Sequence, residues 1–362
     1  MKSRSLQALR AALLSLPILL AACGGSSPAQ APSAAPQAPA ATAAAQPAAA
    51  TPPASQPAPA SLQPVTLQLT WIISGYHAPF VLALEKGYYR QAGLDVKIVE
   101  GRGSSLTVDQ VAKGGMVFGQ GGIEGFVPFI DKGAPIKVIA AYVRESPMSF
   151  IYHPSLKLDT PKDLVGKTII SAAGDQDLTF LPAVLKPYGV SQDQLKVQLT
   201  TPNQYPAIYA QSANNVVIGF VNGDYTRVLQ VDPQAKDKLY SDFGLNLYNA
   251  GLVASESLIQ QHPDVVKAFV EASNKGWQEA IANPAEAVDA TVKDFPQANR
   301  AVIDAGLKYS LPLLDTPATK GRPLGWMAPA DWEQQLQVYK QFGQVKSDKP
   351  ATDYYTDQFV GG

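Results

Sequence analysis

From Pro64 onward, the sequence alternates short strand-like runs with longer helix-like runs, and this alternation limits the possible folds more than any other feature. Residues 65–69 alternate apolar and polar side chains like a strand, whereas residues 78–91 have helical periodicity and stop at Gly93, a residue type favoured just past a helix end. Further strand-like runs occupy residues 95–99, 116–119, 136–142, 167–171, 195–199 and 216–220. Strands that alternate with helices predict an α/β fold with mostly parallel sheets.

Helices are expected between these strands and throughout the carboxyl-terminal part. One helix should open at Thr160-Pro161, because a capping residue is followed there by proline at the first helical position. The final helices are predicted at residues 263–281, 284–293, 297–309 and 331–342. A body of about 300 residues is large for one core. We therefore expect a cleft between two lobes, with residues 64–147 plus 252–362 in the first lobe and residues 148–251 in the second.

The chain begins with a segment typical of a secretory signal. Residues 1–22 have a basic start and an apolar run that is too short to span a bilayer, and two alanines precede Cys23. A cysteine at the cleavage point resembles the bacterial lipoprotein signal, in which this thiol is acylated and the cysteine becomes the mature N-terminus. We expect the mature protein outside the cytoplasm, anchored to the cell membrane by lipid on Cys23. The alternative is a simple secretory signal with an incidental cysteine.

Residues 23–63 are predicted to form a disordered tether. From Gly24 to Gln63 the chain is almost entirely Ala, Pro, Gln, Ser and Thr, with no charged and no aromatic side chain. Such a segment cannot bury enough apolar surface to offset the entropy of ordering, and its prolines favour extended spacing. The tether would let the folded body stand off the membrane.

Composition limits the possible functions. The net charge is −1 and no basic cluster favours nucleic acid. Cys23 is the only cysteine, so once it carries lipid the body has no thiol for a disulfide, a cysteine metal site or a nucleophile. The spacing of the remaining residues supports no metal site, no Ser/His/Asp triad and no glycosidase-like carboxylate pair. We therefore predict no catalytic residue, no metal and no cofactor.

Aromatic side chains cluster directly after the first strand, where ligands bind in open α/β sheets. They are Trp71, Tyr76, His77 and Phe80. Trp71 and Tyr76 offer flat faces to a planar ligand, although such residues also pack cores. His77 is a candidate hydrogen-bonding group in the cleft, but a lone histidine is more often structural.

Two glycine-rich turns of the first lobe supply further candidates for ligand contact. Ser104 and Ser105 end the turn at 101–105, which opens a helix whose free N–H groups suit an anion or a carbonyl. Gln120 and Glu124 flank the next glycine pair. Glu124 lies in a first helical turn, where the helix dipole favours an acid even without a ligand.

The second lobe offers polar residues at two equivalent places. Asp175 and Gln176 start one of its helices, and Asn222 and Asp224 follow the strand at 216–220. All four are candidates for ligand contact, and Asn222 and Asp224 are equally good turn formers.

Six motifs link residues 64–362 to a known family. They are Trp71-(x5)-His77 and the runs at 83–89, 92–96, 101–104, 160–167 and 321–327. Together they resemble the periplasmic binding proteins related to thiamine-pyrimidine synthase. The resemblance implies a two-lobed, type II (Venus-flytrap) binding-protein fold with two crossover strands. It also implies delivery of a small molecule to the permease and ATPase subunits of an ABC importer.

One branch of this family is an enzyme, so the resemblance leaves two activities to weigh. The yeast-type pyrimidine synthase uses a pyridoxal-binding lysine, a sacrificial histidine and a cysteine cluster. This chain has no Lys or His at the matching places near residues 116–119, and its body has no cysteine. We predict a binding protein rather than an enzyme, and we expect a monomer.

The resemblance also bears on the ligand, since family members bind thiamine pyrimidine precursors, riboflavin, or small sulfonates and nitrate. Phosphate-binding relatives carry a Gly-Glu-Phe-Gly turn where this chain has Gly174-Asp175-Gln176-Asp177. Two carboxylates would repel a phosphate and suit hydroxyl donors. A planar ring with a polyol tail, as in riboflavin, is therefore the first choice. A precursor of the hydroxymethylpyrimidine or formylaminopyrimidine type is second. A sulfonate or nitrate is third, because Arg102 is the only basic residue in these loops.

Overall fold

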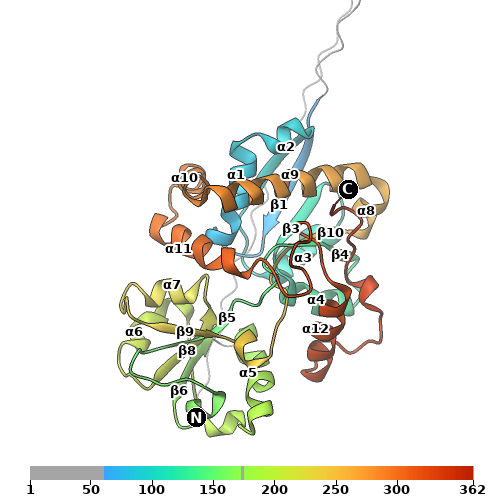
Figure 1. Ribbon diagram of the computed structural model, residues 1–362. Coiled ribbons are helices and arrows are strands. Elements are labelled where there is room, and N and C mark those ends of the chain that lie inside the picture. Colours follow the sequence, from blue (N-terminus) through green and yellow to red (C-terminus); the bar gives the residue numbers. More distant parts are fainter. Residues whose placement is uncertain (1–60, 173–174, 362) are drawn as a thin grey trace, which may run out of the picture. The chain divides into compact units, whose positions relative to one another are not determined.

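The computed structural model describes residues 61–172 and 175–361 (Figure 1). Predictions for the signal, for lipid on Cys23, for most of the tether and for Gly174 lie outside the described residues.

The first sheet has five strands in the order β2-β1-β3-β10-β4. Their bounds are β1 (Gln63–Leu69), β2 (Leu94–Val99), β3 (Val117–Gly122), β4 (Ile136–Ala141) and β10 (Ala250–Ser255). Strand β1 is parallel to both β2 and β3, whereas β10 is antiparallel to both β3 and β4. One antiparallel strand is therefore inserted among four strands that run in one direction.

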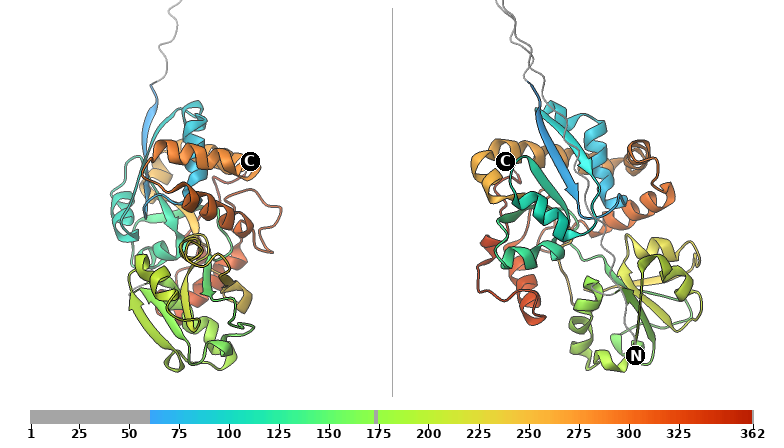
Figure 2. Two further views of the ribbon diagram at one scale, coloured as in Figure 1. Left: turned by 90° about the vertical axis from the view of Figure 1, so that its left-hand side faces the viewer. Right: turned by 180° about the vertical axis from the view of Figure 1, so that it is seen from behind.

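The second sheet repeats this arrangement with the order β7-β6-β8-β5-β9. Its strands are β5 (Met148–Tyr152), β6 (Thr168–Ala172), β7 (Lys196–Thr200), β8 (Asn215–Phe220) and β9 (Lys236–Leu239). Strand β6 is parallel to β7 and β8, and β5 is antiparallel to β8 and β9. We use lobe I for the first sheet with the helices around it and lobe II for the second, as Figure 2 shows them.

The prediction of mostly parallel sheets was wrong, since four of the eight strand pairings are antiparallel. All four involve β5 or β10, the two strands by which the chain enters lobe II and returns to lobe I. Every residue of these two strands is buried, so they lack the alternation that marks a half-exposed strand. The other strand predictions are confirmed to within three residues, and the α/β class is confirmed.

Most helices surround the first sheet. Those of lobe I are α1 (Ala78–Glu85), α2 (Tyr88–Gln91), α3 (Ser104–Ala112), α4 (Ile123–Asp131), α8 (Glu256–Gln261), α9 (Pro263–Ala282), α10 (Pro284–Asp294), α11 (Arg300–Ser310) and α12 (Pro329–Gln341). Those of lobe II are α5 (Gln176–Leu185), α6 (Tyr205–Tyr209) and α7 (Asp224–Val228). In the described part of the chain, none of these helices is long and apolar enough to cross a bilayer.

Short 3-10 helices connect these elements. They are η1 (Gly75–His77), η2 (Pro161–Leu164), η3 (Lys186–Tyr188), η4 (Gln192–Gln194), η5 (Pro202–Gln204), η6 (Ser241–Phe243), η7 (Leu311–Leu313) and η8 (Ala351–Asp353). The helix predicted from Thr160-Pro161 is only the single turn η2, because Val165 leaves the helical conformation and Gly166 has a φ of 77°. The helix predicted at 78–91 is split into α1 and α2, since Gly87 takes a left-handed φ of 70°.

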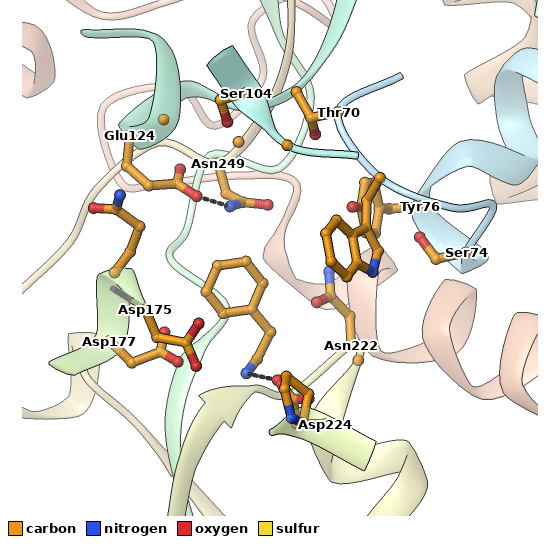
Figure 3. Close-up of a pocket in the computed structure, with 18 of the residues that line it drawn as sticks. Thr70, Ser74, Tyr76, Ser104, Glu124, Asp175, Asp177, Asn222, Asp224 and Asn249 are labelled. Atoms are coloured by element: carbon orange, nitrogen blue, oxygen red, sulfur yellow. Dashed lines mark hydrogen bonds between the residues drawn. The ribbon is translucent and has the colours of Figure 1, made fainter. Parts of the chain in front are cut away.

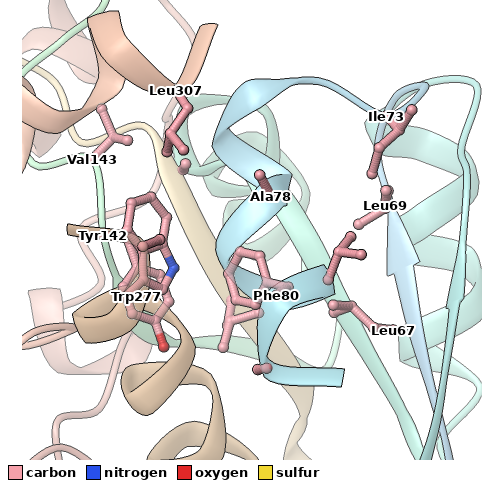
Figure 4. Close-up of a cluster of buried hydrophobic side chains, with 14 of the residues drawn as sticks. Leu67, Leu69, Ile73, Ala78, Phe80, Tyr142, Val143, Trp277 and Leu307 are labelled. Atoms are coloured by element: carbon pink, nitrogen blue, oxygen red, sulfur yellow. The ribbon is translucent and has the colours of Figure 1, made fainter. Parts of the chain in front are cut away.

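An aromatic cluster in the core of lobe I fixes the segment that follows β1 (Figure 4). Phe80 is fully buried and packs edge-on against Tyr142 and Trp277, at ring-centroid distances of 5.4 and 6.0 Å. The ring of Phe80 therefore belongs to the core. Just before it, a Cβ added at Gly75 would lie 2.1 Å from the backbone nitrogen of Leu307, so η1 packs directly on α11. This close packing holds the chain between β1 and α1 in place.

Candidate functional site

A cavity of about 400 Å³ lies where turns of lobe I meet turns of lobe II. The lining residues are Thr70, Trp71, Ser74, Tyr76, Gly103, Ser104, Gly122, Glu124, Gly125, Asp175, Gln176, Asp177, Pro202, Phe220, Asn222, Gly223, Asp224, Arg227 and Asn249 (Figure 3). All but Asn249 follow or end one of the strands β1, β2, β3, β6, β7 and β8. Carboxyl ends of strands are the usual place for ligands in open α/β sheets.

The cavity brings together eight of the eleven residues predicted to contact ligand. These are Trp71, Tyr76, Ser104, Glu124, Asp175, Gln176, Asn222 and Asp224. They come from five separate stretches of sequence in the two lobes, each of which follows one of the strands β1, β2, β3, β6 and β8.

Three predicted residues, His77, Gln120 and Ser105, do not line the cavity. His77 is fully buried behind it, where Nδ1 accepts a hydrogen bond of 2.9 Å from the backbone N–H of Ser74. Burial lowers the pKa of His77 to about 3, so the ring is neutral at physiological pH. Gln120 is fully buried within β3, and Ser105 is exposed on α3. His77 thus supports the segment that carries the aromatic residues.

Three aromatic side chains form the apolar part of the lining. Trp71 follows β1 and remains 48% exposed, at the rim of the cavity. Tyr76 lies in η1, where burial raises the pKa of its hydroxyl to about 12 and keeps it protonated. Phe220 ends β8 and belongs to lobe II. Flat rings from both lobes suit a planar ligand.

Glu124 and Asp177 bring carboxyl groups into the cavity from the two lobes. Glu124 Oε1 accepts a hydrogen bond of 2.9 Å from Asn249 Nδ2, while Oε2 has no partner among the described residues. Asp177, in the first turn of α5, is only 4% exposed, and its Oδ1 likewise has no partner there. Burial raises the pKa of Glu124 to about 7 and that of Asp177 well above its usual range.

The other two lining carboxylates are engaged by the fold. Asp175 Oδ2 accepts hydrogen bonds from the hydroxyl of Tyr205 (2.7 Å) and from the N–H of Ala172 (3.1 Å). Asp224 Oδ2 accepts from the N–H of Phe220 at 3.0 Å, and Oδ1 lies 3.5 Å from Arg227 Nη1. Both carboxylates therefore stabilise the turns in which they lie, and burial raises the pKa of Asp224.

Two amide side chains complete the polar surface. Asn222 Nδ2 donates a hydrogen bond of 3.0 Å to Ser310 Oγ in α11, which leaves its Oδ1 without a partner among the described residues. Gln176 Oε1 is also unpartnered within that part of the chain. We call the four oxygens Glu124 Oε2, Gln176 Oε1, Asp177 Oδ1 and Asn222 Oδ1 the acceptor set. In Figure 3 the labelled residues Glu124, Asp177 and Asn222 surround the same space.

Several lining residues were absent from the sequence-based candidates. They are Thr70, Ser74, Asp177, Pro202, Phe220, Arg227, Asn249 and the lining glycines. Thr70 and Asp177 lie in turns that the sequence analysis had selected, so their positions alone could have made them candidates. Asn249 directly precedes β10, the strand by which the chain returns to lobe I, but no ligand contact was predicted there. Despite the lining acids, no group of three or more potential ligands within residues 61–172 and 175–361 could hold a metal ion.

A family described as NMT1/THI5 like matches residues 74–287. Three relatives show what this chain is similar to. A riboflavin-binding protein, RibY, from Chloroflexus aurantiacus is 26% identical over 95% of this chain and 95% of its own length. A formylaminopyrimidine-binding protein from Halalkalibacterium halodurans is 23% identical over 76% of this chain and 84% of its length. A 4-amino-5-hydroxymethyl-2-methylpyrimidine phosphate synthase from Legionella pneumophila is 22% identical over 82% and 92%.

Solved structures support the same architecture. The periplasmic aliphatic sulphonate binding protein SsuA from Escherichia coli superposes with a TM-score of 0.65 at 13% identity, covering 83% of this chain and 95% of that one. The fold is therefore the two-lobed α/β fold of periplasmic binding proteins.

Proposed function

Because the chain belongs to the NMT1/THI5-like family and has this binding-protein fold, we propose that it captures a small molecule outside the cytoplasm for an ABC importer. The observation that carries the proposal is the cavity of about 400 Å³, to which both lobes contribute rings and buried polar atoms. Its volume lies within the range of small-molecule sites, and its lining has their usual mixture of apolar walls and a few converging polar groups. The names of two relatives as binding proteins support this reading.

The ligand that fits this lining best is a planar heteroaromatic vitamin, and riboflavin is our first choice. Trp71, Tyr76 and Phe220 provide faces for the ring system, and the acceptor set provides oxygens for the hydroxyl donors of a polyol tail. The riboflavin-binding relative, which aligns over nearly the whole chain, supports this choice.

Capture would follow from closure of the two lobes over the ligand. We place lobe I in residues 63–147 plus 250–362 and lobe II in residues 148–249, so that the return lies two residues earlier than the sequence predicts, because Ala250 and Gly251 belong to β10. A ligand that contacts both lobes shifts the population toward the closed state. The closed protein would dock on the permease of the importer, whose ATPase drives uptake. Lipid on Cys23 and the tether at 23–63 would keep a monomer at the membrane and near its permease.

We propose that the protein is not an enzyme, although a synthase is among its relatives. The lining contains no Lys, Cys or His within the described part of the chain, so no lysine amine or thiol faces the cavity there. His77 is fully buried behind the lining, and burial lowers its pKa to about 3. A ligand in the cavity would therefore be held rather than converted.

Purified full-length protein tests the proposal directly. Native mass spectrometry and visible absorbance should detect co-purified flavin, and calorimetry should show stoichiometric binding of riboflavin. Absence of binding to riboflavin and to every pyrimidine tried, by a protein with an intact thermal transition, would overturn it.

The second candidate ligand is an aminopyrimidine precursor of thiamine. The relative that binds formylaminopyrimidine favours it, and amino groups would also donate to the acceptor set. A thermal-shift screen distinguishes the two, since binding stabilises the folded state by mass action. A shift with aminopyrimidines and none with riboflavin would replace the first choice by the second.

A further inference from the structure

We propose that Arg144 is a positioning residue for ligand capture, because together with the motif at 321–327 it fixes the place about which lobe II turns. Two segments connect the lobes, residues 142–147 between β4 and β5 and residues 244–249 between η6 and β10, and we call them the hinge segments. Arg144 and the motif lie outside the cavity lining. The inference rests on the proposed function, because it assumes that the lobes close over a ligand.

The side chain of Arg144, in the first hinge segment, is bound entirely to lobe I. It is only 1% exposed, although it carries a charge. Nη1 donates to the carbonyl oxygens of Pro323 (3.2 Å) and Trp326 (3.0 Å), and Nε donates to that of Leu314. Nη2 donates to Asp315 Oδ1 at 2.6 Å. A planar guanidinium with these four acceptors has little freedom to move. The first hinge segment is therefore fixed to lobe I at this residue.

The motif at 321–327, which the family resemblance includes, provides two of these acceptors. Gly325 has a φ of 89°, a left-handed conformation that favours glycine. Its carbonyl oxygen accepts a hydrogen bond of 2.9 Å from the backbone N–H of Ala141, at the end of β4. The motif thus bends beside the start of the first hinge segment and presents carbonyl groups to Arg144.

The second hinge segment is fixed to the same part of lobe I through Tyr248. Its hydroxyl donates a hydrogen bond of 2.8 Å to Asp331 Oδ2 and accepts one of 3.0 Å from the backbone N–H of Ala328. The backbone N–H of Tyr248 donates to Gln335 Oε1 at 3.1 Å. Residues 313–335 of lobe I therefore bind both hinge segments.

Glu145 marks the change from partners in lobe I to partners in lobe II. Its backbone N–H donates to the carbonyl oxygen of Leu313 in lobe I at 2.9 Å. Its side-chain Oε1 accepts a hydrogen bond of 2.7 Å from Ser241 Oγ in lobe II. Next to it, the backbone N–H of Ser146 donates to Asn246 Oδ1 at 2.7 Å, which joins the two hinge segments to each other.

Backbone rotation is therefore left to residues 145–147 and 244–247, because Arg144 and Tyr248 bind the adjoining residues to lobe I. A hinge consists of a few residues that absorb the change in φ and ψ. With those ends fixed, lobe II approaches lobe I in one orientation. Without the bonds of Arg144, only a fraction of the closed molecules would have that orientation. The apparent dissociation constant rises in inverse proportion to this fraction.

Calorimetry with riboflavin and small-angle X-ray scattering test the inference on the full-length protein. The wild type should become more compact when riboflavin is added. Arg144→Met removes the four hydrogen bonds, and Asp315 stays hydrated because its side chain is 47% exposed. We expect this variant to bind about tenfold more weakly and to compact less even when saturated. Arg144→Lys keeps the charge but not the planar fork, so it should restore part of the affinity.

The matched control is Asp131→Asn, a change in another buried hydrogen-bond network of lobe I. The carboxylate of Asp131 accepts hydrogen bonds from Ser347 Oγ and from the hydroxyl of Tyr354, and it lies outside the hinge segments and the cavity lining. This variant should lower the thermal transition but keep the wild-type affinity and compaction. It therefore separates a loss of stability from a change in the hinge.

Several outcomes would overturn the inference and leave the proposed function intact. One is unchanged affinity and compaction in a folded Arg144→Met variant. Another is an equal loss of affinity in Asp131→Asn, and a third is binding by the wild type without compaction. If Arg144→Met does not fold, Asp315→Ala should weaken binding about threefold, since a half-exposed ion pair contributes little. Unchanged affinity there would also overturn the inference.

The choice of ligand does not decide the test. If an aminopyrimidine binds and riboflavin does not, the same measurements use the aminopyrimidine, with the same expected changes. Binding of neither ligand by the wild type would overturn the proposed function and the inference with it.

Discussion

The turns that follow equivalent strands differ between the two lobes, although the two sheets order their strands in the same way. After β1, lobe I carries Trp71 and Tyr76, whereas after the equivalent β6, lobe II carries the acids Asp175 and Asp177. After β3 lobe I carries the acid Glu124, whereas its equivalent β8 ends in the ring of Phe220 and is followed by the acid Asp224 in lobe II. The shared topology therefore fixes where a ligand can lie, and the composition of the turns decides what it can be.

The largest expected loss of stability comes from a substitution in η1, the turn of lobe I that follows β1. In Gly75→Ala the new Cβ would overlap the backbone of α11, 2.1 Å from Leu307 N, so we expect a loss of about 3 kcal/mol of stability and weak ligand binding. Chemical denaturation measures the loss. The matched change in lobe II, Gly223→Ala, meets no atom closer than 3.8 Å and should cost less than about 1 kcal/mol. Equal losses in the two variants would contradict this account.

Glu124, the lining carboxyl group of lobe I, should make the free energy of unfolding depend on pH. Burial raises the pKa of Glu124 from 4.5 to about 7, so the folded protein holds a proton that the unfolded chain releases. The resulting stability is complete below about pH 4.5 and is lost as pH rises through about 7. Glu124→Gln should therefore lose about 2 kcal/mol less stability than the wild type between pH 5 and pH 8. Denaturation at both pH values checks this, with Asp193→Asn, a change at an exposed acid of lobe II outside the lining, as control. Parallel losses in Glu124→Gln and wild type would show that Glu124 is ionised in the fold.

A third change removes the exposed ring of lobe I. Trp71→Ala should weaken riboflavin binding about tenfold, because a stacking face is lost while the half-exposed side chain contributes little to the core. Calorimetry measures the affinity, and an unchanged thermal transition confirms the fold. The exposed Ile72 provides the control, since Ile72→Ala removes apolar surface outside the lining. Unchanged affinity in Trp71→Ala would remove Trp71 from the binding surface.

The smallest expected effect on stability comes from the hydrogen bond between Asn222 of lobe II and Ser310 of lobe I. Ser310→Ala removes the acceptor of the 3.0 Å hydrogen bond from Asn222, which should cost about 1 kcal/mol. Thermal melts with and without ligand measure this cost. If the bond forms only when the lobes close, the variant should lose more in the ligand-bound state than in the free state. A larger loss in the free state would show that the bond does not depend on closure.

The sequence predicts the location of the site better than the direction of individual side chains. Turns after strands are visible as glycine and polar clusters, which is why Ser104, Glu124 and Asp175 were found. Gln120 follows the same rule by position, but it lies within β3 and is buried there. Phe220 was missed because an apolar residue at the end of a strand has the pattern of a core residue. Side-chain direction at a strand end depends on pairing and twist, which a local pattern does not contain.

The position of β10 also constrains how the chain can fold. This strand lies between β3 and β4 in the middle of the first sheet, although the whole of the second sheet separates β4 from it in sequence. The second sheet is made of one continuous stretch and needs no distant strand for its own pairing. The first sheet lacks its fourth strand in spatial order until β10 (Ala250–Ser255) has been synthesised. Such long-range pairing slows folding, so the amino-terminal part of the body is completed last even though it is synthesised first.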